Sequence, residues 1–86
     1  MNDTTFKDLV ELSDFYIISQ KFEEALKVLK RAEKINKMDP KLYYNMGIAH
    51  EALNENDQAR TAFRQALSLK PDYESAQQHL DRLIGE

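Results

Sequence analysis

Apolar residues recur along the chain at the three- and four-residue spacing of amphipathic helices, in segments divided by short polar turns. The pattern predicts five helices, over about 6–19, 22–36, 40–53, 57–69 and 73–84. The apolar positions expected to face inward are Phe6, Leu9, Leu12 and Tyr16 in the first segment and Ala25, Leu29, Ala32 and Ile35 in the second. Only two Gly and two Pro are present, which makes long loops and sheet turns unfavourable. The sequence therefore predicts an all-α protein.

Polar residues at the segment boundaries fit helix caps. Thr5 and Asp8 form a variant of the capping box, in which the side chains at the cap and three residues later each accept from the other's amide. Asp39 is an expected N-cap, with Pro40 at the first helical position. Asp72 is the expected cap of the last helix.

The chain also matches itself when Leu9 is aligned with Tyr43 and the same register is kept throughout. The matched pairs are Leu9 with Tyr43, Leu12 with Met46, Tyr16 with His50, Ala25 with Ala59, Leu29 with Phe63, and Ala32 with Ala66. Ser13 stands at the place of Gly47, and both are small enough for two helices to cross closely. The match predicts two copies of one helix–turn–helix unit.

The second copy carries the fuller pattern. Its key residues are Tyr43, Met46, Gly47, His50, Ala59, Phe63, Ala66 and Pro71. This set resembles the tetratricopeptide repeat (TPR) family, whose pattern is Trp-x2-Leu-Gly-x2-Tyr, Ala-x3-Phe, Pro with a period of about 34 residues. The offset between the matched pairs equals that period. The resemblance implies a right-handed α-solenoid of antiparallel helix pairs.

The resemblance also gives the domain organisation. Residues 1–86 form a single TPR domain, with repeat one at about 5–38, repeat two at about 39–72 and a capping helix at about 73–84. Gln77 and Asp81 fall at the Trp and Gly places of a third repeat and break its packing pattern. We therefore expect the last helix to cover the end of the array and to keep one face in water.

In the family, the first helix of each repeat lines a concave groove that holds an extended peptide or a partner helix. The resemblance transfers this role to Val10, Asp14, Lys41, Tyr44, Asn45, Ile48, Gln78 and Arg82. Val10, Tyr44 and Ile48 would form an apolar floor, and Asn45 would hydrogen-bond a peptide backbone. The expected function is a protein-interaction module whose partner the sequence does not identify.

A structural role is the alternative. Phe15 and Ile18 fall outside the inward stripe of the first helix and give it a second apolar surface. We expect this helix to pack against something outside the two repeats. A second copy in a symmetric homodimer and a further repeat of a longer TPR array both satisfy that expectation.

A basic face runs along the second helix. We define it as Lys27, Lys30, Arg31 and Lys34, at i, i+3, i+4 and i+7, together with Lys37 just beyond. One interpretation is a solvated outer surface, partly neutralised by a Glu23–Lys27 pair at i, i+4. The other is attachment to an anionic partner, either an acidic protein tail or a membrane surface.

Composition narrows the remaining function classes. The net charge of -3 argues against a dedicated nucleic-acid binder, and no apolar run approaches the roughly 20 residues of a membrane span. No signal peptide is apparent, so a cytoplasmic setting is expected. The chain has no Cys, and His50 and His79 are not spaced for a shared metal. We expect His50 to be packed and His79 to be exposed, and we expect neither enzyme activity nor a cofactor.

Overall fold

The computed structural model describes residues 4–85, which form five α-helices and no strand. The helices are α1 (Phe6–Ile18), α2 (Phe22–Ile35), α3 (Pro40–Ala52), α4 (Asn56–Leu69) and α5 (Glu74–Gly85). Each bound lies within one residue of the predicted one. The all-α expectation is therefore confirmed.

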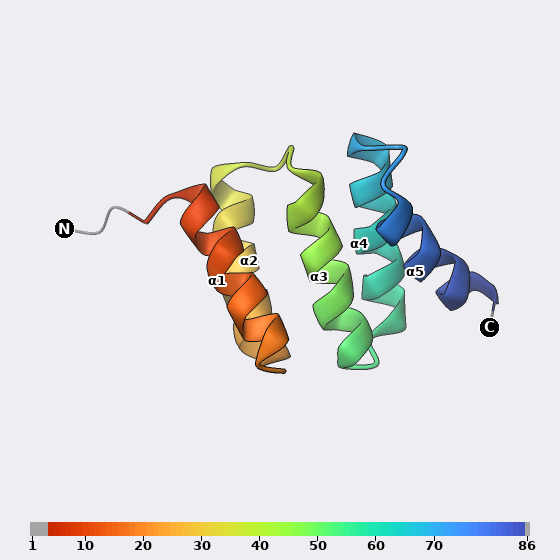
Figure 1. The fold of residues 1–86 in the computed structure, drawn as a ribbon, viewed down its shortest axis with the longest axis horizontal. Coiled ribbons are helices and arrows are strands. Elements are labelled where there is room, and N and C mark those ends of the chain that lie inside the picture. The colour runs from red at the N-terminus through yellow and green to blue at the C-terminus, as the bar shows by residue number, and fades with distance from the viewer. Residues whose placement is uncertain (1–3, 86) are drawn as a thin grey trace.

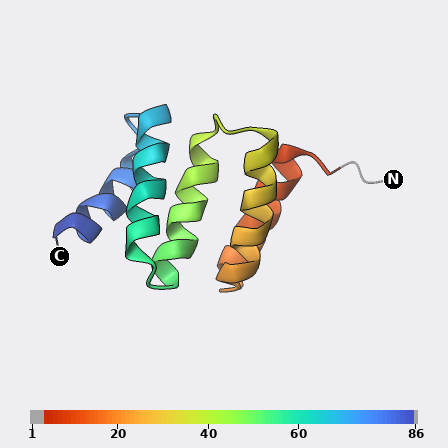
Figure 2. The ribbon, with the colours of Figure 1, turned by 180° about the vertical axis from the view of Figure 1, so that it is seen from behind.

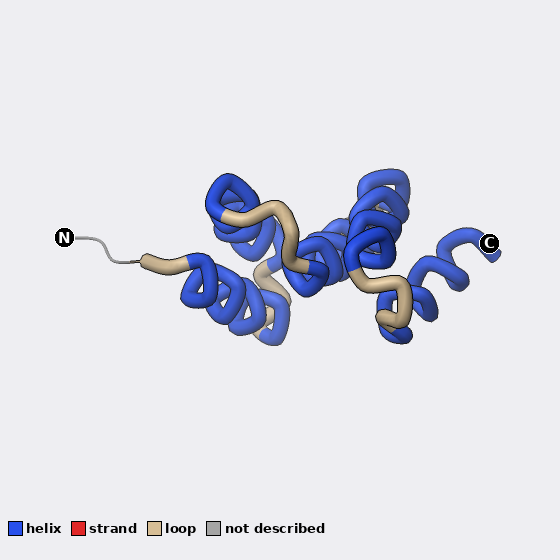
Figure 3. Tube along the Cα trace, turned by 90° about the horizontal axis from the view of Figure 1, so that it is seen from above, coloured by secondary structure: helices blue, strands red, loops and turns tan. Residues whose placement is uncertain are grey.

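The helices follow one another as antiparallel neighbours in an elongated array (Figure 1). α1 pairs with α2, α3 pairs with α4, and α5 packs against α4. From behind, α2 and α4 lie on the near side (Figure 2). From above, α1 and α5 lie to one side of the array and α2 and α4 to the other, with α3 between them (Figure 3). This arrangement leaves a concave surface over α1, α3 and α5.

The internal repeat is visible in the backbone of the two intra-repeat turns. Gln20 and Asn54 are the non-glycine residues with positive φ among the described residues, at 61° and 62°. In both turns the next amide donates to the carbonyl oxygen five residues earlier, at 2.8 Å after Gln20 and 2.9 Å after Asn54. These bonds define Schellman motifs, which satisfy carbonyls at the helix C-terminus. The two helix pairs therefore turn in the same way.

Two of the three expected caps are present. Thr5 and Asp8 form the reciprocal capping box. Asp39 Oδ1 accepts from the backbone amides of Lys41 and Leu42 at 2.7 and 3.2 Å. Asp72 was expected to cap α5, but the helix begins at Glu74, which puts Tyr73 and not Asp72 at the cap position.

Small residues stand where the helices cross. The side chains of Ala25, Ala32, Ala59 and Ala66 are fully buried. A β-carbon built on Gly47 would lie 2.6 Å from the ring of Phe63, well inside contact distance. The steric reason for the repeat pattern is therefore present in the packing.

Two residues expected to face inward do not. Leu12 is 36% exposed and Ile35 is 56% exposed. Their equivalents in repeat two, Met46 and Leu69, pack against the core. For Leu12 the difference follows from position in the array, because α1 is the first described helix and no described element packs on its outer side. Ile35 is the last residue of α2.

Candidate functional site: the groove between α1 and α3

Two adjoining pockets lie between α1 and α3, and together we call them the groove. The larger has a volume of about 390 Å³ and is lined by Asp14, Ile17, Ile18, Lys41, Tyr44, Asn45 and Ile48. The smaller has a volume of about 260 Å³ and is lined by Phe6, Lys7, Val10, Glu11, Asp14, Asp39 and Lys41. Each helix contributes side chains one turn apart, since residues three and four positions apart share a helix face.

Six of the eight residues predicted for the site meet in this groove. Five line the larger pocket, namely Asp14, Lys41, Tyr44, Asn45 and Ile48, and Val10 lines the smaller one. Gln78 and Arg82 belong to α5 and line neither of these pockets. The structure thus brings six of the predicted residues into the groove and leaves the other two outside it, on α5.

An ion pair separates the two pockets. Lys41 Nζ lies 3.0 Å from Asp14 Oδ2, and both residues line both pockets. The side chains are 52% and 36% exposed, so solvent screens their attraction and the pair adds little to stability. Its main consequence is geometric, because it places a polar bridge between two apolar hollows.

Asn45 holds the two walls of the groove together. It is 3% exposed, and its Nδ2 donates to Ser13 Oγ at 3.0 Å and to Asp14 Oδ1 at 2.8 Å. The Ser13 hydroxyl donates in turn to the Val10 carbonyl at 2.7 Å. The amide donor expected for a peptide backbone is therefore engaged inside the protein. The position of Asn45 in the repeat does not reveal this, because the acceptors belong to α1, which is distant in the sequence.

The α5 end of the concave surface is aromatic. The ring of Tyr44 stacks on Tyr73 with centroids 5.0 Å apart and meets His79 edge-on at 5.8 Å. His79 also stacks on Phe63, at 5.1 Å and 14° between planes. Its side chain is only 22% exposed, so the expectation of an exposed His79 is wrong. Packing of α5 across α3 and α4 buries the ring.

Two family sequence models match the chain between residues 14 and 73. One described as TPR repeat matches residues 14–54, and one described as Tetratricopeptide repeat matches residues 40–73. The chain belongs to the tetratricopeptide repeat family. TPR repeats generally serve as protein-interaction or scaffold modules. No curated protein matches the chain.

Polar side-chain contacts hold α5 against α3. His79 Nδ1 lies 2.9 Å from Glu51 Oε1, and the Arg82 guanidinium lies 3.6 Å from Glu51 Oε2. These contacts join α3 to α5 beside the aromatic cluster. Arg82 therefore faces the concave surface while remaining 61% exposed.

Two tyrosine side chains have perturbed acidities. Burial, followed by the nearby Tyr44, Asp39 and Asp14, raises the pKa of Tyr73 to about 12. Burial also raises the pKa of Tyr43, whose hydroxyl donates to Glu33 Oε2 at 3.2 Å. Both groups therefore stay protonated and neutral well above physiological pH.

Residues missed by the sequence reasoning complete the groove. Phe6 and Asp39 line the smaller pocket, whereas the sequence assigned them to the core and to a helix cap. Ile17 and Glu11 line the groove as well, each three residues from Asp14 along the same helix face. His50 is packed as expected, with a side chain 13% exposed that lies 2.8 Å from Glu55 Oε1.

Two features are absent from residues 4–85, the part of the chain that the structure describes. No group of three or more potential metal-ligating side chains gathers in this part of the chain. Of the helices formed by these residues, none combines the length and the apolar character that crossing a membrane requires.

Proposed function

We propose that this TPR domain is a non-catalytic interaction module that holds a segment of a partner protein in the groove between α1 and α3. The observation that carries the proposal is the larger pocket, where four apolar side chains meet at the surface. These are Ile17, Ile18, Tyr44 and Ile48. Concave, mostly apolar pockets with a few polar groups are the usual form of a binding site.

The pocket chemistry suggests what the segment carries. An apolar side chain of the partner would enter the larger pocket and contact the isoleucines. The Asp14–Lys41 pair beside it offers both an acceptor and a donor for a polar group next to that side chain. A second apolar side chain would reach Phe6 and Val10 in the smaller pocket.

Ile18 gives the sharpest test because it lines the pocket and is 81% exposed, so its replacement removes little folding energy. Peptides selected from a displayed random library would be measured for affinity by fluorescence anisotropy. Ile18→Ser should weaken their binding by about tenfold, the loss expected for one buried aliphatic contact.

Ile84→Ser is the matched control, since Ile84 is 55% exposed on α5 and lines neither pocket. It should leave affinity unchanged. Equal losses of peptide affinity in the two variants, or no loss in either, would show that the groove does not bind the peptides.

Scaffolding by self-association is the second candidate function. Phe15 on α1 is 59% exposed beside Leu12, which is 36% exposed, and no described residue covers this apolar surface. A second copy in a homodimer, or a further repeat of a longer TPR array, would cover it. Sedimentation over a concentration series should show association of the wild type that Phe15→Ser abolishes. A strictly monomeric wild type at all concentrations would exclude the homodimer.

A further inference from the structure

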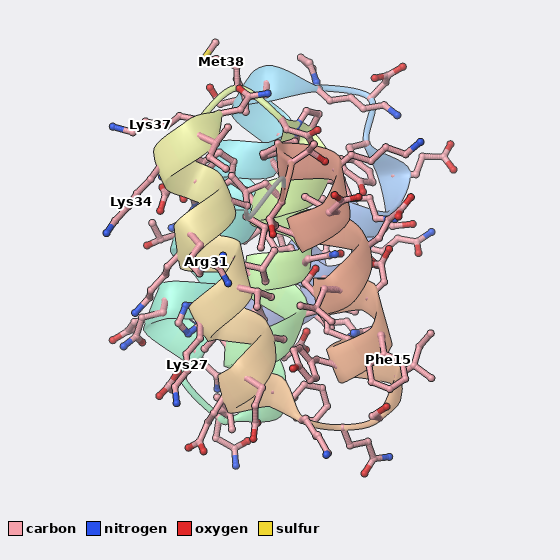
Figure 4. The ribbon with its side chains drawn as sticks, turned by 90° about the vertical axis from the view of Figure 1, so that its left-hand side faces the viewer. Phe15, Lys27, Arg31, Lys34, Lys37 and Met38 are labelled. Carbon is pink, nitrogen blue, oxygen red and sulfur yellow. The ribbon has the colours of Figure 1, made fainter. Side chains whose placement is uncertain are left out.

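The basic face is free of internal partners. Lys27, Lys30, Arg31, Lys34 and Lys37 are all exposed, and none forms an ion pair with a described residue. The Glu23–Lys27 pair expected from the sequence is absent, because both side chains extend into solvent and no contact holds them together. Figure 4 shows the labelled cations on one flank of α2. Five cations thus lie on one surface without an ion pair and outnumber the three carboxylates of α2, which are Glu23, Glu24 and Glu33, in a chain whose net charge is -3.

The fold does not require this charge. The internal repeat gives the equivalent positions in repeat two, which are Thr61, Arg64, Gln65, Ser68 and Pro71. Only one of them is a cation, and yet α4 packs in the same way as α2. The basic face is therefore a feature of repeat one and not of the repeat architecture.

Exposed apolar residues lie at one end of the basic face. Met38 is 71% exposed and Ile35 is 56% exposed. Met38 projects beyond the end of α2, next to Lys37 and Lys34 (Figure 4). The backbone amide of Met38 donates to Asn36 Oδ1 at 2.9 Å, which shapes the projecting turn. The result is an apolar tip beside a row of cations.

We propose that the basic face and the Met38 tip bind the surface of an anionic lipid membrane. Clusters of four to eight Lys and Arg residues suit the negative potential of such a surface. A projecting apolar side chain flanked by lysines can enter a soft lipid interface, whereas binding to an acidic protein segment requires only the cations.

The negative net charge does not oppose this docking. The molecule extends 47 Å along its longest axis, and charges in physiological salt are screened over about 8 Å. The membrane therefore experiences mainly the local charge of α2 and Lys37, where five cations outnumber Glu23, Glu24 and Glu33. Since the groove lies between α1 and α3, this surface adds a membrane attachment to the protein-binding role and does not depend on it.

The experiment uses the full chain and vesicles of phosphatidylcholine, with and without phosphatidylserine. Co-sedimentation should show binding only to vesicles that contain phosphatidylserine, and the binding should fall as salt rises. The triple variant Lys27→Gln/Arg31→Gln/Lys34→Gln should bind roughly 100-fold more weakly, at about fivefold per cation. The triple variant Arg60→Gln/Arg64→Gln/Lys70→Gln changes net charge equally within repeat two and should bind like the wild type.

Insertion of the apolar tip into lipid can be measured separately by fluorescence. The chain contains no Trp, so Met38→Trp introduces a single indole whose emission should shift to shorter wavelength on phosphatidylserine vesicles. Thr61→Trp, on the outer face of α4, should show no shift. Met38→Ser should weaken vesicle binding several-fold, and Met38→Leu should retain it.

Three results would overturn the proposal. One is undetectable binding to phosphatidylserine vesicles, including the case in which polyglutamate binds instead and identifies an acidic protein as the partner. Another is equal binding by the α2 triple variant and the wild type. The third is a loss of vesicle binding in the repeat-two triple variant equal to that in the α2 triple variant. Ile18→Ser should leave vesicle binding intact, so failure of the groove proposal and failure of this one are distinguishable.

Discussion

The junction between α1 and α3 is built around a hydrogen bond. Asn45 of α3 donates to Ser13 and Asp14 of α1, at 3.0 and 2.8 Å. Ser13 and Leu29, which occupy the repeat positions of Gly47 and Phe63, are both fully buried. The junction is specific because its polar atoms find partners only in this alignment.

The corresponding junction between α3 and α5 is aromatic. The positions equivalent to Ser13, Leu29 and Asn45 in the repeat register are Gly47, Phe63 and His79. The ring of Phe63 packs so close to Gly47 that a β-carbon there would lie 2.6 Å from it. His79 then stacks on that ring at 5.1 Å, where Asn45 makes its hydrogen bonds.

The two junctions show that a repeat position fixes a volume more than a residue type. Ser with Leu and Gly with Phe divide a similar space in opposite ways. Each division brings its own cross-junction contact, a hydrogen bond in one case and a ring stack in the other. Moving a single residue from one junction to the equivalent position of the other should therefore lower the free energy of unfolding. Moving two residues that contact each other should lower it by less than the two single changes together.

The largest expected effect is that of Gly47→Ser, which gives the second junction the residue of the first. The new β-carbon meets the fully buried Phe63 ring, and overpacking of this kind costs roughly 1–3 kcal/mol. Urea unfolding would measure the loss. Adding Phe63→Leu should recover part of this loss. The double variant should therefore lose less free energy of unfolding than the sum of the two single losses.

The first junction supplies the control. Ser13→Gly removes atoms and creates no clash, so its cost should come from the lost hydrogen bond and lower helix propensity, about 1–2 kcal/mol. If Phe63→Leu gives Gly47→Ser no relief, the two positions do not share one space and the comparison fails.

The features shared by the two repeats are those that the sequence predicts well. The self-match of the chain, the paired Ala residues and the Pro40 helix start depend on local spacing, which a single sequence displays directly. The TPR family, the helix bounds and the meeting of most of the groove residues all follow from that spacing. Local steric rules are enough for these features because neighbours along the helix are also neighbours in space.

The features that differ between the repeats are those that sequence reasoning misses. Asn45 is engaged by Ser13 and Asp14, and His79 is buried against Phe63. Both outcomes depend on which side chain stands opposite, on a different helix that is distant in the sequence. Leu12 has the right period for a core position and is exposed only because no described helix covers it. Helical periodicity identifies a face but does not identify its neighbour.

Asn45→Ala has the next largest expected effect. It removes both hydrogen bonds of the first junction while Asp14 keeps its ion pair with Lys41. The expected loss is about 1–2 kcal/mol in urea unfolding. Ser13→Ala in the same background should cost less than it does in the wild type, because the shared bond is already gone. Strictly additive losses would show that the hydrogen bond does not couple the helices.

Replacement of the positive-φ residues compares the two turns directly. Gln20 and Asn54 have nearly the same φ, 61° and 62°, but Asn tolerates this conformation better than Gln. Gln20→Gly should therefore raise the free energy of unfolding by up to about 1 kcal/mol, and Asn54→Gly by less. Thermal unfolding of both variants would measure the difference. A larger gain at Asn54 would mean that side-chain contacts, rather than backbone strain, set the stability of these turns.

The smallest effect is confined to high pH and belongs to the aromatic junction alone. Tyr73 stands where the first junction has Asp39, and its pKa is raised to about 12, from a usual value of about 10. The unfolded chain releases this proton first, so the stability that Tyr73 adds is complete below pH 10 and declines as the pH rises toward 12. Tyr73→Phe should match the wild type at neutral pH and lose less stability above pH 10. Urea midpoints at several pH values for both proteins would measure this, with the shared titration of lysines cancelling in the difference. If the urea midpoints of the two proteins fall in parallel as the pH rises, burial does not raise the pKa of Tyr73.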